Sequence, residues 1–214
     1  MELYSKETAA AVAQKLLDIQ AIRLQPNQPF TWASGWKSPI YCDNRLSLSF
    51  PAVRTFIKNA LVEAIKSKFP AAEAIAGVAT AGIPQGALIA EAMDLPFIYV
   101  RSKPKGHGME NMIEGKVTAN QKVVVIEDLI STGGSSLKAV EALKAAGFEV
   151  LGMAAIFTYG FDLAAKNFQD ANIKLVCLSD YEAMLPQAID SKYVSDSDLD
   201  SLGEWRKSPN TWKQ

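Results

Sequence analysis

The stretch that decides the fold is Val123-Val124-Val125-Ile126-Glu127-Asp128-Leu129-Ile130-Ser131-Thr132-Gly133-Gly134-Ser135-Ser136. Its first four residues are β-branched, which indicates a strand buried on both faces, as in a parallel sheet. Apolar residues then recur at helical spacing, at Leu137, Val140 and Leu143, and Gly147 ends the pattern. We therefore predict a strand, a short loop, and a helix that opens at Ser135-Ser136.

The loop between this strand and this helix has the composition of an anion site. Serine, threonine and glycine residues lead into a helix N-terminus, where free backbone N–H groups and the helix dipole favour a phosphate. Glu127 and Asp128 stand just before the loop, and carboxylates accept hydrogen bonds from sugar hydroxyls. Taken alone, such a pair is more often a solvated strand end before an ordinary turn. The two features together favour a site for a phosphorylated sugar.

The whole stretch resembles the 5-phosphoribosyl-1-diphosphate (PRPP) signature of type I phosphoribosyltransferases. In that signature two acids follow an apolar strand, and a Ser/Thr-Thr-Gly-Gly loop comes two residues later. The resemblance assigns Glu127 and Asp128 to the ribose hydroxyls of PRPP and the Ser131 to Ser135 loop to its 5-phosphate. It also includes Leu129 and Ile130 among the PRPP-binding residues. It implies an α/β fold, with a mostly parallel central sheet between helices.

The rest of the chain alternates between strand and helix patterns, which predicts right-handed βαβ units. Helices are expected over 5–20, 51–69, 84–93 and 161–170, the third started by Pro84. Strands are expected over 74–78, 96–100, 149–158 and 173–178. Residues 30–45 are predicted to form short strands and turns outside the main sheet. The end of the chain, with Trp205 and Trp212, is predicted to be a solvated helix packed by its tryptophans.

A second loop should meet the first, because ligands bind at the carboxyl ends of parallel strands. Ala79 to Ile83 follow a predicted strand and are small enough for close approach to an anion. Gly77 and Gly82 have P-loop spacing, but Ile83 stands where that motif needs lysine, which excludes a Walker site. A tight turn is the structural alternative, whereas the resemblance assigns Ala81 and Gly82 to the diphosphate.

A third loop, Arg101 to Gly108, holds three cations and the single histidine of the chain. A solvated charged loop is the plain alternative. The loop follows a sheet strand directly, however, so it can close over the site and stabilise a departing diphosphate.

This loop, read with residues 30–41, narrows the resemblance to the orotate phosphoribosyltransferase family over essentially the whole chain. The Phe-Thr start that leads to Ser-Gly-x-Lys-Ser-Pro is typical of that family's amino-terminal hood, and Arg-x-x-x-Lys-x-His-Gly is typical of its catalytic loop. The resemblance implies that Arg101, Lys105 and His107 bind the diphosphate. It implies catalytic roles for Lys105, His107 and Asp128, and a contact of Ser131 with orotate.

The implied reaction transfers ribose 5-phosphate from PRPP to a ring nitrogen of orotate, giving orotidine 5-phosphate and diphosphate in pyrimidine synthesis. Mg²⁺ is the implied cofactor, held mainly through substrate oxygens, with no metal cage made by the protein. The resemblance also implies a homodimer in which loop 101–108 reaches the neighbouring site. A purine phosphoribosyltransferase would share the Glu127 to Ser135 stretch, and a PRPP-sensing regulator of the same fold is the non-enzyme alternative.

Four positions differ from the enterobacterial form of the family, which carries cations there: Ala33, Ala81, Ser102 and Tyr159. The nearest other cations are Lys103, Lys37 and Arg45, and the last two are further candidates for binding orotate.

Length, charge and cysteine content indicate the domain organisation, the kinds of partner and the compartment. The 214 residues fit one domain, with the hood mainly within 1–50, the core at about 51–190 and a helical tail at about 191–214. The net charge of −1 argues against a nucleic-acid or membrane partner. Cys42 and Cys177 lack the spacing of a zinc site and are expected to be reduced thiols. The start shows no signal pattern and no apolar run approaches ~20 residues, so we expect a cytoplasmic protein.

Overall fold

The structure, a computed structural model, describes residues 1–32, 35–103 and 112–213. Its centre is a sheet that has seven strands within these ranges, in the order β1-β11-β10-β9-β6-β7-β8. The strands are β1 (Glu2–Leu3), β6 (Ala74–Val78), β7 (Phe97–Val100), β8 (Ile113–Glu114), β9 (Lys122–Ile130), β10 (Glu149–Thr158) and β11 (Leu175–Asp180). Neighbouring strands are parallel except β8, which is antiparallel to β7. The predicted α/β class is confirmed.

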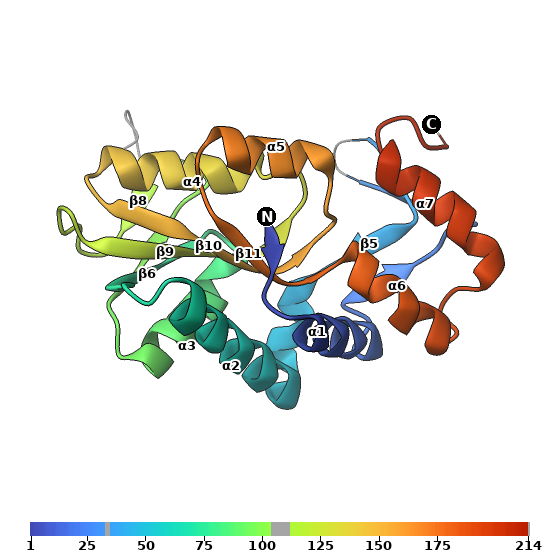
Figure 1. Ribbon diagram of the computed structural model, residues 1–214, viewed down its shortest axis with the longest axis horizontal. Helices are drawn as coiled ribbons and strands as arrows, with labels where there is room; N and C mark the ends of the chain where they lie inside the picture. Colours follow the sequence, from blue (N-terminus) through green and yellow to red (C-terminus); the bar gives the residue numbers. More distant parts are fainter. Residues whose placement is uncertain (33–34, 104–111, 214) are drawn as a thin grey trace.

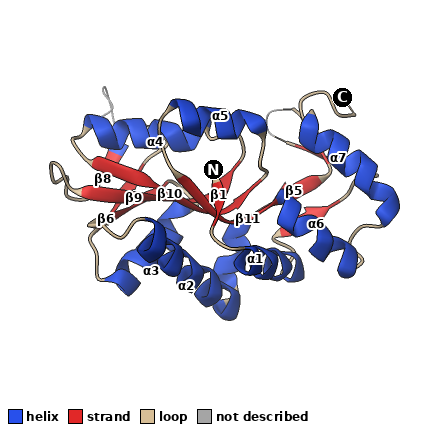
Figure 2. Cartoon of the chain, viewed as in Figure 1, coloured by secondary structure: helices blue, strands red, loops and turns tan. Residues whose placement is uncertain are grey.

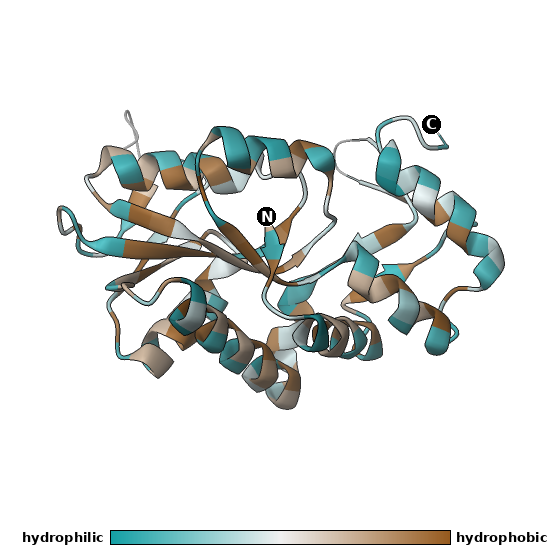
Figure 3. Cartoon of the chain, in the orientation of Figure 1, coloured by the Kyte–Doolittle hydropathy of each residue, from teal (hydrophilic) through white to brown (hydrophobic). Residues whose placement is uncertain are grey.

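Helices cover both faces of the sheet (Figures 1 and 2). One face carries α1 (Lys6–Asp18), α2 (Pro51–Lys68) and α3 (Gly82–Met93), and the other carries α4 (Gly134–Ala145) and α5 (Asp162–Asp170). Side chains of β9 alternate between two buried clusters, so that Val124 and Ile126 pack in one and Val123 and Val125 in the other. Strand β9 is therefore buried on both faces, as its β-branched run predicted. Apolar residues accordingly gather on the strands (Figure 3).

The hood is a separate small layer beside the end of the sheet. Strand β2 (Ile22–Leu24) pairs antiparallel with β5 (Ile40–Cys42), and β3 (Phe30–Thr31) pairs antiparallel with β4 (Lys37–Ser38). A 3₁₀ helix, η1 (Asn44–Ser49), then leads back to α2. The prediction of short strands outside the main sheet is confirmed.

The C-terminal segment packs against the hood more closely than the sequence indicated. It comprises α6 (Tyr181–Asp190), the 3₁₀ turn η3 (Asp196–Asp198) and α7 (Leu199–Lys207). Trp205 of α7 is fully buried and contacts Tyr159 and Trp32, with ring centroids 5.7 and 5.8 Å away. The predicted helix and its packing through tryptophans are confirmed, but its inner face belongs to the core.

Several boundaries differ from the predictions for physical reasons. Helix α3 begins at Gly82, two residues before Pro84, because the first turn of a helix needs no partner for its backbone N–H groups and tolerates proline. Helix α6 and the short edge strands β1 and β8 were not predicted. None of the described helices is both long and apolar enough to cross a membrane.

Candidate functional site

The acidic pair lies on the last part of β9, not after it. The strand continues to Ile130 because β10 pairs with it past both acids, Glu127 opposite Ala155 and Leu129 opposite Phe157. Glu127 is buried, and its two carboxylate oxygens accept hydrogen bonds from Ser136 Oγ at 3.0 Å and from the Asp128 N–H at 3.1 Å. Asp128 is half-buried, so it presents the more accessible carboxylate of the pair.

Burial raises the pKa of both acids, and their mutual repulsion adds to the rise at Glu127. Burial raises the pKa of Glu127 to about 8, and the neighbouring charge of Asp128 adds to this shift. Burial also raises the pKa of Asp128, but hydrogen bonds and the charge of Arg45 oppose that rise. The two acids therefore titrate as a pair, and the pair holds a proton more tightly than separate, exposed carboxylates would.

The loop after β9 has the geometry of an anion site. Gly133 has a φ of 81°, and an added Cβ there would lie 2.6 Å from Cε2 of Phe168, so only glycine fits. The Asn167 side chain of α5 donates to the Thr132 carbonyl at 2.9 Å and holds the loop in place. Helix α4 begins at Gly134, and its first backbone N–H groups have no partner within the helix. These groups and the helix dipole can bind a phosphate.

The loop after β6 lies beside the acidic pair because α3 packs directly on β9. A Cβ at Gly82 would collide with the Ile126 carbonyl oxygen, so glycine is needed for this approach. The loop itself contains Ala79, Thr80 and Ala81, and the Ala79–Thr80 peptide bond is cis.

These two loops meet at a cavity of about 400 Å³, which we name the acidic cavity. Strand β6 and its loop supply one wall, and the end of β9, Ser135 of α4 and the start of η1 supply the others. Its lining residues are Cys42, Asp43, Arg45, Val78, Ala79, Thr80, Ala81, Glu127, Asp128, Leu129 and Ser135. The predicted meeting of the first two loops is therefore confirmed.

A second cavity, of about 430 Å³, opens between the hood and the end of the sheet, and we name it the aromatic cavity. It is lined by Thr31, Trp32, Tyr41, Cys42, Leu129, Ser131 and Tyr159. The two cavities share Cys42 and Leu129 and therefore adjoin. The rings of Trp32 and Tyr159 lie 5.1 Å apart, tilted by 31°. Burial raises the pKa of the Tyr159 phenol well above its usual value, so it stays a neutral hydrogen-bonding group.

The predicted cations fall at different places. Lys37 Nζ donates to Thr31 Oγ1 at 2.9 Å, beside the aromatic cavity, whereas Arg45 lines the acidic cavity. Arg101 follows β7, its N–H donates to the Met112 carbonyl, and its guanidinium lies 3.5 Å from Glu114. Lys105 and His107 lie outside the described residues, as does most of the third loop. Among the described residues, no group of three or more His, Cys, Asp or Glu could hold a metal ion.

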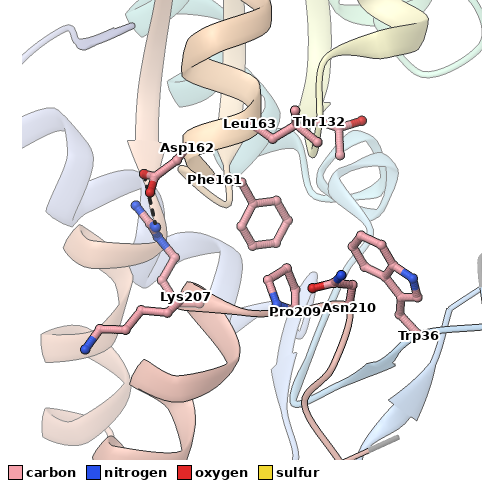
Figure 4. Close-up of a pocket in the computed structure, with 9 residues that line it drawn as sticks. Trp36, Thr132, Phe161, Asp162, Leu163, Lys207, Pro209 and Asn210 are labelled. Atoms are coloured by element: carbon pink, nitrogen blue, oxygen red, sulfur yellow. Dashed lines mark ion pairs between the residues drawn. The ribbon is translucent and has the colours of Figure 1, made fainter.

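A third cavity, of about 350 Å³, lies between the C-terminal segment, the hood and the loop after β10 (Figure 4). Thr132 lines it together with Trp36 and Phe161, and Arg206 lies 3.9 Å from Asp162 there. Thr132 therefore faces this side, while Ser131 and Ser135 line the aromatic and acidic cavities. Ile130 is buried, and its carbonyl accepts from Thr158 Oγ1 at 3.1 Å, which is a structural contact.

Sequence reasoning missed Asn44, which joins the hood to the acidic pair. Its Nδ2 donates to the Asp128 carbonyl at 2.7 Å, and its side chain is buried. It also missed that Cys42 stands where the two cavities meet. No local pattern could have found these contacts, because Asn44 and Asp128 are 84 residues apart in the sequence.

Comparison with known proteins agrees with this geometry. Residues 47–185 match the model of the phosphoribosyl transferase domain. The orotate phosphoribosyltransferase of Cytophaga hutchinsonii is 61% identical over 211 residues, which cover 99% of each chain. That of Porphyromonas gingivalis is 56% identical over 207 residues, covering 97% of this chain and 99% of the relative. The crystal structure of the orotate phosphoribosyltransferase from Aeropyrum pernix superposes with a TM-score of 0.74 at 28% identity, covering 82% of this chain and 97% of that one. The chain therefore belongs to the orotate phosphoribosyltransferase family, within the larger family of proteins that carry a phosphoribosyl transferase domain.

Proposed function

We propose that the chain transfers ribose 5-phosphate from PRPP to a ring nitrogen of orotate, forming orotidine 5-phosphate and releasing diphosphate. One observation carries this proposal: an acidic cavity beside an anion-binding loop adjoins an aromatic cavity, and the two share Cys42 and Leu129. The first suits a phosphorylated sugar and the second suits a planar ring. The ribose 5-phosphate group could be transferred from one ligand to the other where the two cavities meet.

In this proposal the 5-phosphate binds to the loop Ser131 to Ser135, through the backbone N–H groups at the start of α4. Asp128 accepts hydrogen bonds from the ribose hydroxyls, while Glu127, bonded to Ser136, fixes the end of the strand. The anomeric carbon loses its bond to a diphosphate oxygen and gains a bond to the ring nitrogen, which gives up its proton to the departing diphosphate or to water. Positive charge develops on the sugar in between, and Asp128 orients the ribose without attacking it.

The orotate ring would lie in the aromatic cavity against Trp32 and Tyr159, with Ser131 at its edge. Lys37 is our candidate for the orotate carboxylate, because its ammonium group donates to Thr31, which lines this cavity. Stacking on flat rings and one nearby cation suit a planar anion.

Mg²⁺ belongs to the proposal as a cofactor held mainly by substrate. The donor set fits this role, because Asp128 offers carboxylate oxygens to the acidic cavity, while the described residues contain no group of three or more His, Cys, Asp or Glu that could enclose an ion. When bound, the ion would neutralise charge on the diphosphate. We also place the protein in the cytoplasm, which suits its free thiols Cys42 and Cys177.

Arg101, Lys105 and His107 are proposed to bind the diphosphate, with loop 101–108 serving the neighbouring subunit of a homodimer. Mixing Lys105→Ala chains with Asp128→Asn chains tests this arrangement. Random pairing makes half of the dimers mixed, and each mixed dimer has one complete site, so activity should return to about a quarter of the wild-type value. Mixed dimers that exchange subunits and stay inactive would contradict it.

A base panel tests the reaction itself. With labelled PRPP and Mg²⁺, the protein should form a nucleotide from orotate and none from adenine, hypoxanthine, guanine or uracil. A purine consumed faster than orotate would favour a purine phosphoribosyltransferase. Tight PRPP binding without turnover of any base would favour a PRPP-sensing regulator.

A further inference from the structure

The acidic cavity is poorly charged for the ligand that it is proposed to hold. Three carboxylates line it, those of Asp43, Glu127 and Asp128, and Arg45 is the one cation among its described lining residues. PRPP is a polyanion, and Arg45 is the cation among the described residues of this cavity that can bind its negative charge. This step rests on the proposed function.

The guanidinium of Arg45 is held by one carboxylate and still has donors free for a ligand. Its Nε and Nη2 donate to the two oxygens of Asp43 at 2.6 and 2.9 Å, an arrangement that fixes the plane of the group. A guanidinium has five N–H donors, so three of them point away from Asp43. The Arg45 side chain is 58% exposed, so a ligand can reach these donors.

The segment that carries Arg45 is anchored to the rest of the site. The buried Asn44 donates to the Asp128 carbonyl, and the buried Ser47 donates to the Asn44 carbonyl at 2.6 Å. Arg45 thus stands at a fixed place next to the acidic pair. Its charge acts on that pair, because burial raises the pKa of Asp128 and Arg45 opposes the rise.

We propose that Arg45 binds the diphosphate group of PRPP and of the released product, and that Asp43 is the positioning residue that holds it there. The diphosphate is the part of PRPP that needs this cation, because the start of α4 already offers backbone donors to the 5-phosphate. The loop of Thr80 and Ala81 lines the same cavity and carries no charge. Arg45 does not line the aromatic cavity, so this role differs from the contact with orotate that the sequence suggested.

Variants at Arg45 test the proposal because they should weaken the binding of PRPP and diphosphate and leave the binding of orotate and ribose 5-phosphate almost unchanged. Arg45→Gln should raise both the KM for PRPP and the Kd for magnesium diphosphate by about tenfold or more. The KM for orotate and the Kd for ribose 5-phosphate should stay within about twofold. Arg45→Lys should fall between wild type and Arg45→Gln, because lysine keeps the charge but loses the planar fork. Lys166→Gln is the control, since it removes an exposed cation that is paired with Asp170 away from both cavities.

Asp43 offers an independent test of positioning. Asp43→Asn should weaken the binding of magnesium diphosphate less than Arg45→Gln does, and adding it to Arg45→Gln should cause little further loss. Additive losses would show that Asp43 acts separately, through its cap on η1. An unchanged Kd for diphosphate in a folded Arg45→Gln protein, or a rise confined to the KM for orotate, would overturn the proposal. The proposed function would survive either result if wild-type protein still turns over orotate.

Discussion

The two halves of the site are built in different ways. The half at the end of the sheet consists of the end of β9, the start of α4 and the loop after β6, and main-chain groups supply much of its chemistry. Its strands are buried on both faces, and Gly82 allows α3 to touch β9 directly. The hood half consists of two-stranded sheets and η1, and its chemistry comes from side chains such as Lys37 and Arg45 that are partly exposed.

Because of this difference, mutations at the sheet end and mutations in the hood should have different effects. The acids of the sheet end are proposed to hold the sugar and its glycines allow close packing, so changes at the sheet end should affect turnover or stability strongly. Exposed hood side chains can change with little cost to stability, so they should alter the binding of one ligand at a time.

The largest effect is expected at the accessible acid of the sheet end. Asp128→Asn should reduce kcat by about two orders of magnitude or more, because the ribose loses its charged acceptor. The thermal unfolding midpoint should change little, since asparagine has the same shape and removes a repulsive charge next to Glu127. Orotidine 5-phosphate formation at saturating PRPP, followed by absorbance, measures this loss. Near-normal turnover would contradict a role for Asp128 in binding the ribose.

The next effect concerns stability. Gly82→Ala should lower the free energy of unfolding by about 1–3 kcal/mol, because its Cβ would push α3 away from the Ile126 carbonyl. Gly203→Ala in α7 is a matched control, since an added Cβ there meets nothing within 4 Å and should stabilise the helix by about 0.5–1 kcal/mol. Urea unfolding of both variants makes the comparison. Equal effects at the two glycines would show that the contact of α3 with β9 is not tight.

The third effect is a change of stability with pH. The raised pKa of Glu127 means that the folded state binds a proton more tightly than the unfolded state, so its contribution to stability is present below about pH 4.5 and is lost as the pH rises towards about 8. Glutamine does not titrate in this range, so the stability of Glu127→Gln should not fall in this way as the pH rises. The variant should therefore gain roughly 1–3 kcal/mol relative to wild type between pH 5 and pH 9. Urea unfolding of both proteins at the two pH values measures the gain. A difference in the free energy of unfolding that is the same at both pH values would contradict the raised pKa of Glu127.

Most strands and helices of both halves could be predicted from sequence, and the contacts between distant segments could not. The β-branched run at Val123 and the helical period after it are local patterns, and they gave the start of β9 and both ends of α4 to within a residue or two, although β9 continues four residues past Ile126. Strand β8 has only two residues and forms by pairing with β7, so no period reveals it. The bond from Asn44 to Asp128, and the burial of Glu127 against Ser136, depend on contacts between distant segments.

The same limit applies to the cations. Lys37 and Arg45 were equivalent candidates in the sequence, because both belong to the hood. Only the fold separates them, placing one beside the aromatic cavity and the other on the acidic cavity. Tyr159, at a position that carries a cation in the enterobacterial form, is enclosed by Trp32, Phe161 and Trp205, where a charge would be costly.

A crystal structure of the complex with orotidine 5-phosphate tests most directly whether the sheet end binds the sugar phosphate and the hood binds the base. We expect phosphate oxygens at about 3 Å from backbone N–H groups of the Ser131 to Ser135 loop. The ribose hydroxyls should face Asp128, and the pyrimidine ring should lie in the aromatic cavity against Trp32 and Tyr159. A pyrimidine ring in the acidic cavity, or a phosphate bound away from this loop, would contradict this division of the site.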